Sequence, residues 1–162
     1  LEEMLAGTDC KLQIADCRSV VMIQCVGSRD EEHPYCSRIC CTEAIKNALA
    51  IKERSPETEV TILYRDIRTF GFKERYYRQA REKGVRFLEY DKEQKPKVEA
   101  ISAASVASQP AEPSAELRVE VVAQPEGEVF GLDADLVVLS AGIGPGEGNE
   151  ALARVLKVPL TV

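Results

Sequence analysis

Residues 19–54 read SVVMIQCVGSRDEEHPYCSRICCTEAIKNALAIKER, and this stretch decides the fold. Residues 19–25 form a continuous apolar run rich in β-branched side chains, which predicts a strand buried in a parallel sheet. A polar loop follows it. From residue 42 to residue 54 the apolar residues recur at helical spacing, and Pro56 limits the predicted helix. The stretch therefore predicts a strand, a loop and a helix, the opening unit of an α/β domain.

The alternation of strand and helix continues along the chain. Buried strands are predicted at residues 60–64, 85–90 and 134–141, and helices at residues 73–83 and 149–156, with Asn149 as the cap of the second helix.

Residues 91–130 follow a different pattern. Short strands are predicted at residues 98–101 and 117–122, and the Ala/Ser/Pro-rich stretch at 102–115 predicts a hairpin tip between them. We therefore expect an α/β fold: a Rossmann-like parallel sheet with flanking helices and a small antiparallel β-meander insert. Residues 1–162 are expected to form a single nucleotide-binding-like domain that contains this insert.

The composition excludes several classes of function. A net charge of −6 without a basic block argues against nucleic-acid binding. There is no run of about 18 apolar residues, so we expect no membrane span. The six cysteines come without a secretory signal, which predicts a reducing compartment. Because the chain begins with Leu1, we expect a piece of a larger protein.

Four of the six cysteines are grouped with the spacing C-x10-C-x3-C-C. They are Cys25, Cys36, Cys40 and Cys41. Thiolates at this density suit zinc or an iron–sulfur cluster. Structural zinc sites usually combine two C-x2–4-C pairs, so the adjacent pair at the end of this pattern favours a cluster. The other two, Cys10 and Cys17, are interpreted as ordinary thiols.

The cysteines lie where a dinucleotide-binding domain would have its glycine-rich phosphate turn. In such domains the first strand leads into G-x-G-x-x-G, but only Gly27 is present here. Cys25 is expected at the end of the strand. Cys40 and Cys41 are expected near the first helical turn, where free N–H groups and the helix dipole stabilise anionic sulfur. For both sulfurs to reach one cluster, one of this pair is expected to lie off the helix.

Three residues are weaker candidates for binding a nucleotide cofactor. Gly27 lies in the first turn, and Gly142 opens a glycine-rich run after a predicted strand. Arg65 follows the second predicted strand, where NADP-binding domains place an arginine for the 2′-phosphate. The alternatives for Arg65 are a solvated loop or a partner-docking face. His33 is expected to have only a loop role.

Four segments resemble the A subunit of CoB–CoM heterodisulfide reductase and related subunits of quinone-interacting oxidoreductases. They are IQCVGSRDEEHPYCSRICC, VTILYRDIRTFG, YYRQAREKGVRFLEYD and DADLVVLSAG. The resemblance covers most of the chain except the first fifteen residues and the Ala/Ser/Pro-rich insert. It implies that the four grouped cysteines ligate a [4Fe–4S] cluster in the second, nucleotide-binding-like domain of a larger flavoprotein.

The resemblance also implies a setting for this domain. The parent proteins are cytoplasmic oxidoreductases with FAD, and their expected partners are other heterodisulfide reductase-type subunits, a hydrogenase-like or NADH-linked donor, and ferredoxin. A homodimer is a further alternative for an isolated domain. The first hypothesis is an electron-transfer module without catalytic residues of its own. The alternatives are the NAD(P)H-binding domain of a flavin disulfide oxidoreductase and a structural zinc domain.

Overall fold

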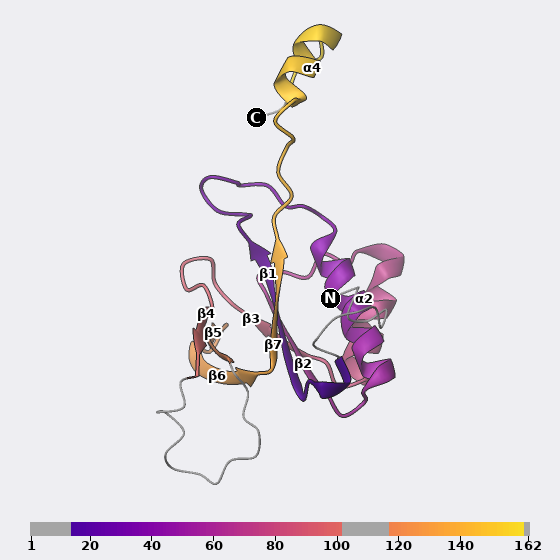
Figure 1. The fold of residues 1–162 in the computed structure, drawn as a ribbon, viewed down its shortest axis with the longest axis vertical. Helices are drawn as coiled ribbons and strands as arrows, with labels where there is room; N and C mark the ends of the chain where they lie inside the picture. Colours follow the sequence, from indigo (N-terminus) through magenta and orange to yellow (C-terminus); the bar gives the residue numbers. More distant parts are fainter. Residues whose placement is uncertain (1–13, 102–116, 161–162) are drawn as a thin grey trace.

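Two β-sheets form the body of the molecule, shown in a computed structural model that describes residues 14–101 and 117–160 (Figure 1). The larger sheet has four parallel strands in the order β3-β2-β1-β7: β1 (Ser19–Val26), β2 (Glu59–Tyr64), β3 (Arg86–Glu89) and β7 (Leu136–Ala141). The smaller sheet is antiparallel in the order β4-β5-β6: β4 (Lys97–Ala100), β5 (Leu117–Ala123) and β6 (Glu128–Ala134). The predicted α/β fold with a parallel sheet and an antiparallel insert is confirmed.

Helices α2 (Cys40–Arg54) and α3 (Glu74–Glu82) pack against one face of the parallel sheet. Short 3₁₀ turns, η1 (Ile14–Asp16) and η2 (Gly71–Lys73), precede β1 and α3. Helix α4 (Asn149–Leu156) stands away from both sheets at the end of an extended segment (Figure 1). Within the described ranges, no helix has both the length and the apolar content needed to cross a bilayer.

Strand β1 is buried on both of its faces. Val20 and Met22 belong to the apolar cluster beneath the helices, whereas Val21 and Ile23 belong to the cluster beneath the antiparallel sheet. Side chains alternate between the two faces of a strand, so an apolar residue is needed at each of these positions. The antiparallel sheet thus covers the face that lies opposite α2 and α3, and the molecule has three layers.

The predicted strand at residues 134–141 begins two residues later in the structure, as β7, because Ala134 belongs to the preceding strand β6. Ala134 ends β6 and Leu136 begins β7, with Asp135 between them. The Asp135 carboxylate accepts hydrogen bonds from the N–H groups of Arg18 at 2.7 Å and Ser19 at 2.9 Å. Asp135 therefore ties the start of β1 to the chain that enters β7. The residue pattern alone does not reveal this break, because it does not show that the Asp135 carboxylate binds the distant backbone of Arg18 and Ser19.

Two further predictions about local structure differ in their outcome. The sequence predicts Asn149 as the cap of the last helix, but the cap position is Gly148, and no side-chain hydrogen bond caps that helix. Asn149 is instead the first helical residue. The predicted hairpin tip at residues 102–115 lies outside the described residues, and so does Cys10.

We expect Asp135→Ala to lower the free energy of unfolding by about 2 kcal/mol, because two backbone N–H groups lose a charged acceptor. Urea denaturation of the metal-free chain measures this. Asp133→Ala is the matched control, since it removes only an exposed ion pair to Arg118 at 3.4 Å and is expected to cost about 0.5 kcal/mol or less. Equal losses of unfolding free energy in the two variants would show that the hydrogen bonds of Asp135 contribute no more than an exposed ion pair.

Candidate functional site

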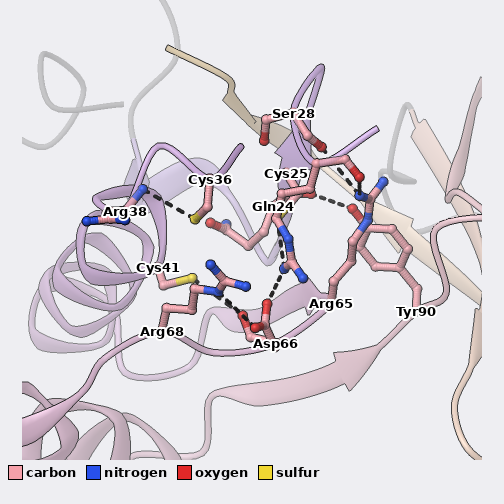
Figure 2. A network of polar contacts seen from close by, with 11 residues as sticks. Gln24, Cys25, Ser28, Cys36, Arg38, Cys41, Arg65, Asp66, Arg68 and Tyr90 are labelled. Atoms are coloured by element: carbon pink, nitrogen blue, oxygen red, sulfur yellow. Dashed lines mark hydrogen bonds and ion pairs between the residues drawn. The ribbon is translucent and has the colours of Figure 1, made fainter. Parts of the chain in front are cut away.

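The four cysteines predicted as ligands lie at the carboxyl end of β1, in the loop that follows it and at the start of α2, and Figure 2 shows Cys25, Cys36 and Cys41. Cys25 lies near the end of β1 and is buried, and Cys36 comes from the following loop and is half-buried. Cys40 and Cys41 are the first two residues of α2. The thiol of Cys41 is close enough to the other three to interact with them electrostatically. All four are free cysteines in the structure.

The prediction that Cys40 or Cys41 lies off the helix is wrong. The helix begins at Cys40, and Ile39 is its cap residue. Successive residues of an α-helix point about 100° apart around its axis, so the two thiols diverge without any break in the helix. Cys41 is buried and its thiol contacts the carbonyl oxygen of Asp66 at 3.7 Å, whereas Cys40 is only half-buried.

Both zinc and an iron–sulfur cluster are held by thiolate ligands. Over residues 14–101 and 117–160, no three His, Cys, Asp or Glu side chains converge closely enough to hold a metal ion. A zinc ion needs all its sulfur ligands within about 2.3 Å of one centre. An iron–sulfur cluster, in contrast, distributes its thiolates over several iron atoms. The four free thiols match the number of protein ligands of either centre.

The backbone of the cysteine loop adopts conformations that are uncommon for residues other than glycine. Cys25, Arg29 and Arg38 have φ angles of 60°, 59° and 63°, in the left-handed region. At the same place the pairing of β1 with β7 shifts register between Ile23 and Val26. Such an irregularity redirects side chains relative to a regular strand. Strained backbone of this kind is concentrated at functional sites, and here it coincides with the cysteines.

Positive charge and N–H groups surround the sulfur atoms. A guanidinium nitrogen of Arg29 lies 4.0 Å from Cys25 Sγ and also forms an ion pair with Asp66. Arg68 Nε donates to the same carboxylate at 2.8 Å. The backbone N–H of Arg38 donates to Cys36 Sγ at 3.3 Å. These groups favour negative charge on sulfur and are of the kind that tunes thiolate-ligated centres.

Burial raises the pKa of the Cys25 and Cys41 thiols above the ordinary value. At Cys25 the neighbouring Arg29 guanidinium opposes this effect, and at Cys41 the backbone N–H of Arg68 does so. Near neutral pH the metal-free site therefore holds these two groups as neutral thiols. Because only thiolates bind metal, loading the site must release protons.

In the metal-free chain we expect iodoacetamide to modify Cys36 and Cys40 at least about tenfold faster than Cys25 and Cys41. The second pair is buried and has a raised thiol pKa, while only the thiolate reacts. Mass spectrometry of peptides after timed alkylation measures the four rates. The rates for Cys25 and Cys41 should rise as pH increases through and above 9. Uniform rates at all four positions would contradict the geometry of the site.

Gln24 is part of the site although the sequence pattern does not single it out. The side chain is fully buried, and neither its Oε1 nor its Nε2 has a hydrogen-bond partner among the described residues. The backbone carbonyl oxygen of Gln24, in contrast, accepts a hydrogen bond from the Tyr90 hydroxyl at 2.5 Å. An unsatisfied buried amide costs about 1–3 kcal/mol. The available signal was one polar residue in the otherwise apolar run VVMIQC.

The weaker candidates Gly27, Arg65 and Gly142 all contact the cysteine loop. Gly27 has a φ of 64°, and its carbonyl oxygen would lie 2.6 Å from a Cβ placed on Gly142. The Arg65 guanidinium donates to the carbonyl oxygens of Ser28 at 3.3 Å and Arg29 at 2.7 Å (Figure 2). Protein backbone therefore occupies the space beside these residues, and their interactions hold the loop in position.

We expect Gly142→Ala to lower the free energy of unfolding by about 1–3 kcal/mol, because its Cβ would overlap the Gly27 carbonyl. Thermal or urea unfolding measures this. Gly146→Ala is the control in the same glycine-rich run, where the nearest atom to the new Cβ is 3.7 Å away. A Gly142→Ala variant as stable as the control would show that the close approach of the two turns is unimportant.

Comparison with known proteins gives consistent relatives. No protein-family model matches the chain. It is 43% identical over 148 residues to the A subunit of ferredoxin:CoB-CoM heterodisulfide reductase from Methanosarcina acetivorans, covering 87% of this chain and 16% of that protein. It is 45% identical over 146 residues to the iron-sulfur A subunit of CoB–CoM heterodisulfide reductase from Methanocaldococcus jannaschii, covering 88% of this chain and 20% of the relative.

A third relative has a different combination of activities in its name. It is the A subunit of H(2)/formate:CoB-CoM heterodisulfide,ferredoxin reductase from Methanococcus maripaludis, 41% identical over 145 residues, with 87% of this chain and 20% of that protein covered. The chain thus spans between 16% and 20% of the length of these three relatives.

Proposed function

Because the chain belongs to the family of CoB–CoM heterodisulfide reductase A subunits, matching one segment of its members, we propose that it is an electron-transfer module with an iron–sulfur site. One observation carries the proposal. Four soft sulfur donors gather at the end of β1 and the start of α2, among arginine side chains that favour negative charge on sulfur. No catalytic residue is proposed within the segment.

The donor set fits a [4Fe–4S] cluster held by Cys25, Cys36, Cys40 and Cys41. Four free thiols are available at the end of β1, in the loop that follows it and at the start of α2. Bound there, a cluster would supply a centre that takes up and releases single electrons. The chain's own residues would provide ligation, shield two of the four thiolates from solvent, and offset their charge through Arg29 and the backbone N–H groups of Arg38 and Arg68.

The contacts of Arg65 and Gly142 favour this proposal over a nucleotide site. In a nucleotide-binding turn the backbone leaves room for the phosphates. Here Gly142 lies directly against Gly27, and the Arg65 guanidinium is bound to two carbonyl groups of the loop. We therefore propose that these residues brace the cysteine loop.

We extend the proposal to the protein of which this segment would be part. It would be a cytoplasmic oxidoreductase that carries FAD elsewhere and works with other heterodisulfide reductase-type subunits. Ferredoxin and a hydrogenase-like or NADH-linked donor would be its redox partners. The names of the relatives support the proposed redox partners, since they include ferredoxin in two cases and H(2)/formate in one.

We expect anaerobic reconstitution with iron and sulfide to load about four iron and four sulfide per chain, giving a reduced-state EPR signal. Serine substitution of any one of the four cysteines should remove most of this iron, because each would supply one ligand. Cys17→Ser is the matched control and should retain the cluster, since Cys17 lies in the core beneath the helices at the other end of β1.

Three outcomes of this experiment are informative. Tight binding of one zinc ion, with no iron uptake by the wild-type chain, would favour the structural zinc domain. Loss of the EPR signal in Cys17→Ser but not in Cys36→Ser would show that the ligand set is wrong. Saturable binding of NADPH by the metal-free chain, abolished by Arg65→Ala, would favour a nucleotide-binding domain.

A further inference from the structure

The Gln24 side chain is a polar group that the fold leaves unpartnered inside the site. It is fully buried, and within the described part of the chain its amide nitrogen and oxygen both lack a hydrogen-bond partner. Met22, two residues earlier, faces the helices, and α2 begins with Cys40 next to this end of the strand. Figure 2 shows the Gln24 side chain extending toward Cys36.

The position of Gln24 is held from the opposite side of β1. The Tyr90 hydroxyl donates to the backbone carbonyl oxygen of Gln24 at 2.5 Å, and Tyr90 itself is buried beneath the antiparallel sheet. The backbone is therefore fixed, and the side chain cannot reach solvent by a small movement of the strand. An apolar side chain of similar length, like that of Met22, would satisfy the packing without burying an amide.

Most guanidinium groups near the sulfur atoms bind acceptors of the protein, although Arg65 Nε and the Thr42 hydroxyl, like the Gln24 amide, lack a partner among the described residues. Arg29 and Arg68 both bind the Asp66 carboxylate, and Arg65 donates to loop carbonyl groups. The two N–H bonds of the Gln24 amide have no such acceptor among the described residues. The sulfur atoms of a cluster are acceptors that would satisfy this donor.

We propose that the Gln24 side-chain amide donates an N–H···S hydrogen bond to the cluster held by the four cysteines and raises its reduction potential. This rests on the proposed function. Reduction adds negative charge to the cluster, so a hydrogen bond to its sulfur stabilises the reduced state more than the oxidised state. Gln24 thereby sets the potential of the centre without being one of its ligands.

The test is an EPR-monitored redox titration of the reconstituted chain and two variants of similar side-chain length. Gln24→Met removes the amide, and Gln24→Glu replaces its donors with a carboxyl group. At a fixed solution potential we expect the ratio of reduced to oxidised cluster to fall about tenfold in Gln24→Met, which for one electron is about 59 mV. The ratio should fall further in Gln24→Glu above the pKa of the new carboxyl group.

Met22→Leu is the control two residues earlier on the same strand, and it should leave the ratio unchanged. A second measurement needs no variant. In the reduced wild-type protein, electron–nuclear double resonance should detect a proton that is coupled to the unpaired electron and exchanges in D2O. When the glutamine side chains are labelled with 15N, it should also detect a coupling of the electron to that nitrogen.

The outcomes separate this inference from the proposed function. If the wild-type chain takes up no cluster, the proposed function fails. If the wild-type chain holds a cluster but shows no coupled glutamine proton, the inference about Gln24 is overturned and the proposed function stands. The inference about Gln24 is also overturned if a variant at position 24 holds the cluster with the same ratio of reduced to oxidised form as the wild-type chain. A coupled proton together with the tenfold fall establishes the hydrogen bond.

Discussion

Burial of β1 on both faces is the constraint on which the rest of the structure depends. Its side chains alternate between a cluster beneath α2 and α3 and a cluster beneath the antiparallel sheet, and its backbone pairs with β2 and β7. The strand is held on all four sides, so its carboxyl end has a fixed position. Cys25 lies at that end, where an irregular pairing and a positive φ redirect the chain into the cysteine loop.

The site at this end of β1 combines opposing electrostatic effects. Burial favours neutral thiols at Cys25 and Cys41, whereas Arg29 and the backbone N–H of Arg68 favour thiolates. An anionic metal centre would resolve this opposition, because it gives the cations and N–H donors an acceptor. The unpartnered amide of Gln24 fits the same explanation. The turn that holds phosphates in dinucleotide-binding domains is here filled by the close contact of Gly27 with Gly142.

The main strands and helices and the position of the cysteines could be predicted, because strong local patterns fix these elements. The apolar run of β1 and the helical spacing of α2 follow from burial, and one short loop joins the end of this strand to the start of this helix, so the grouping of the cysteines was predictable. The break at Asp135 was not, because its carboxylate acts on residues distant in sequence. Gln24 was missed because one polar residue in an apolar strand does not indicate which atoms surround it.

The sequence by itself determined the order of strands and helices, the C-x10-C-x3-C-C spacing and the family to which the chain is related. These depend on hydrophobic periodicity and residue identity, which are local properties. Only the tertiary structure decided that the antiparallel sheet covers the second face of β1, that Arg65 binds the cysteine loop, and that Gln24 lacks a partner among the described residues. These depend on contacts between distant segments, which exist only after the chain has packed.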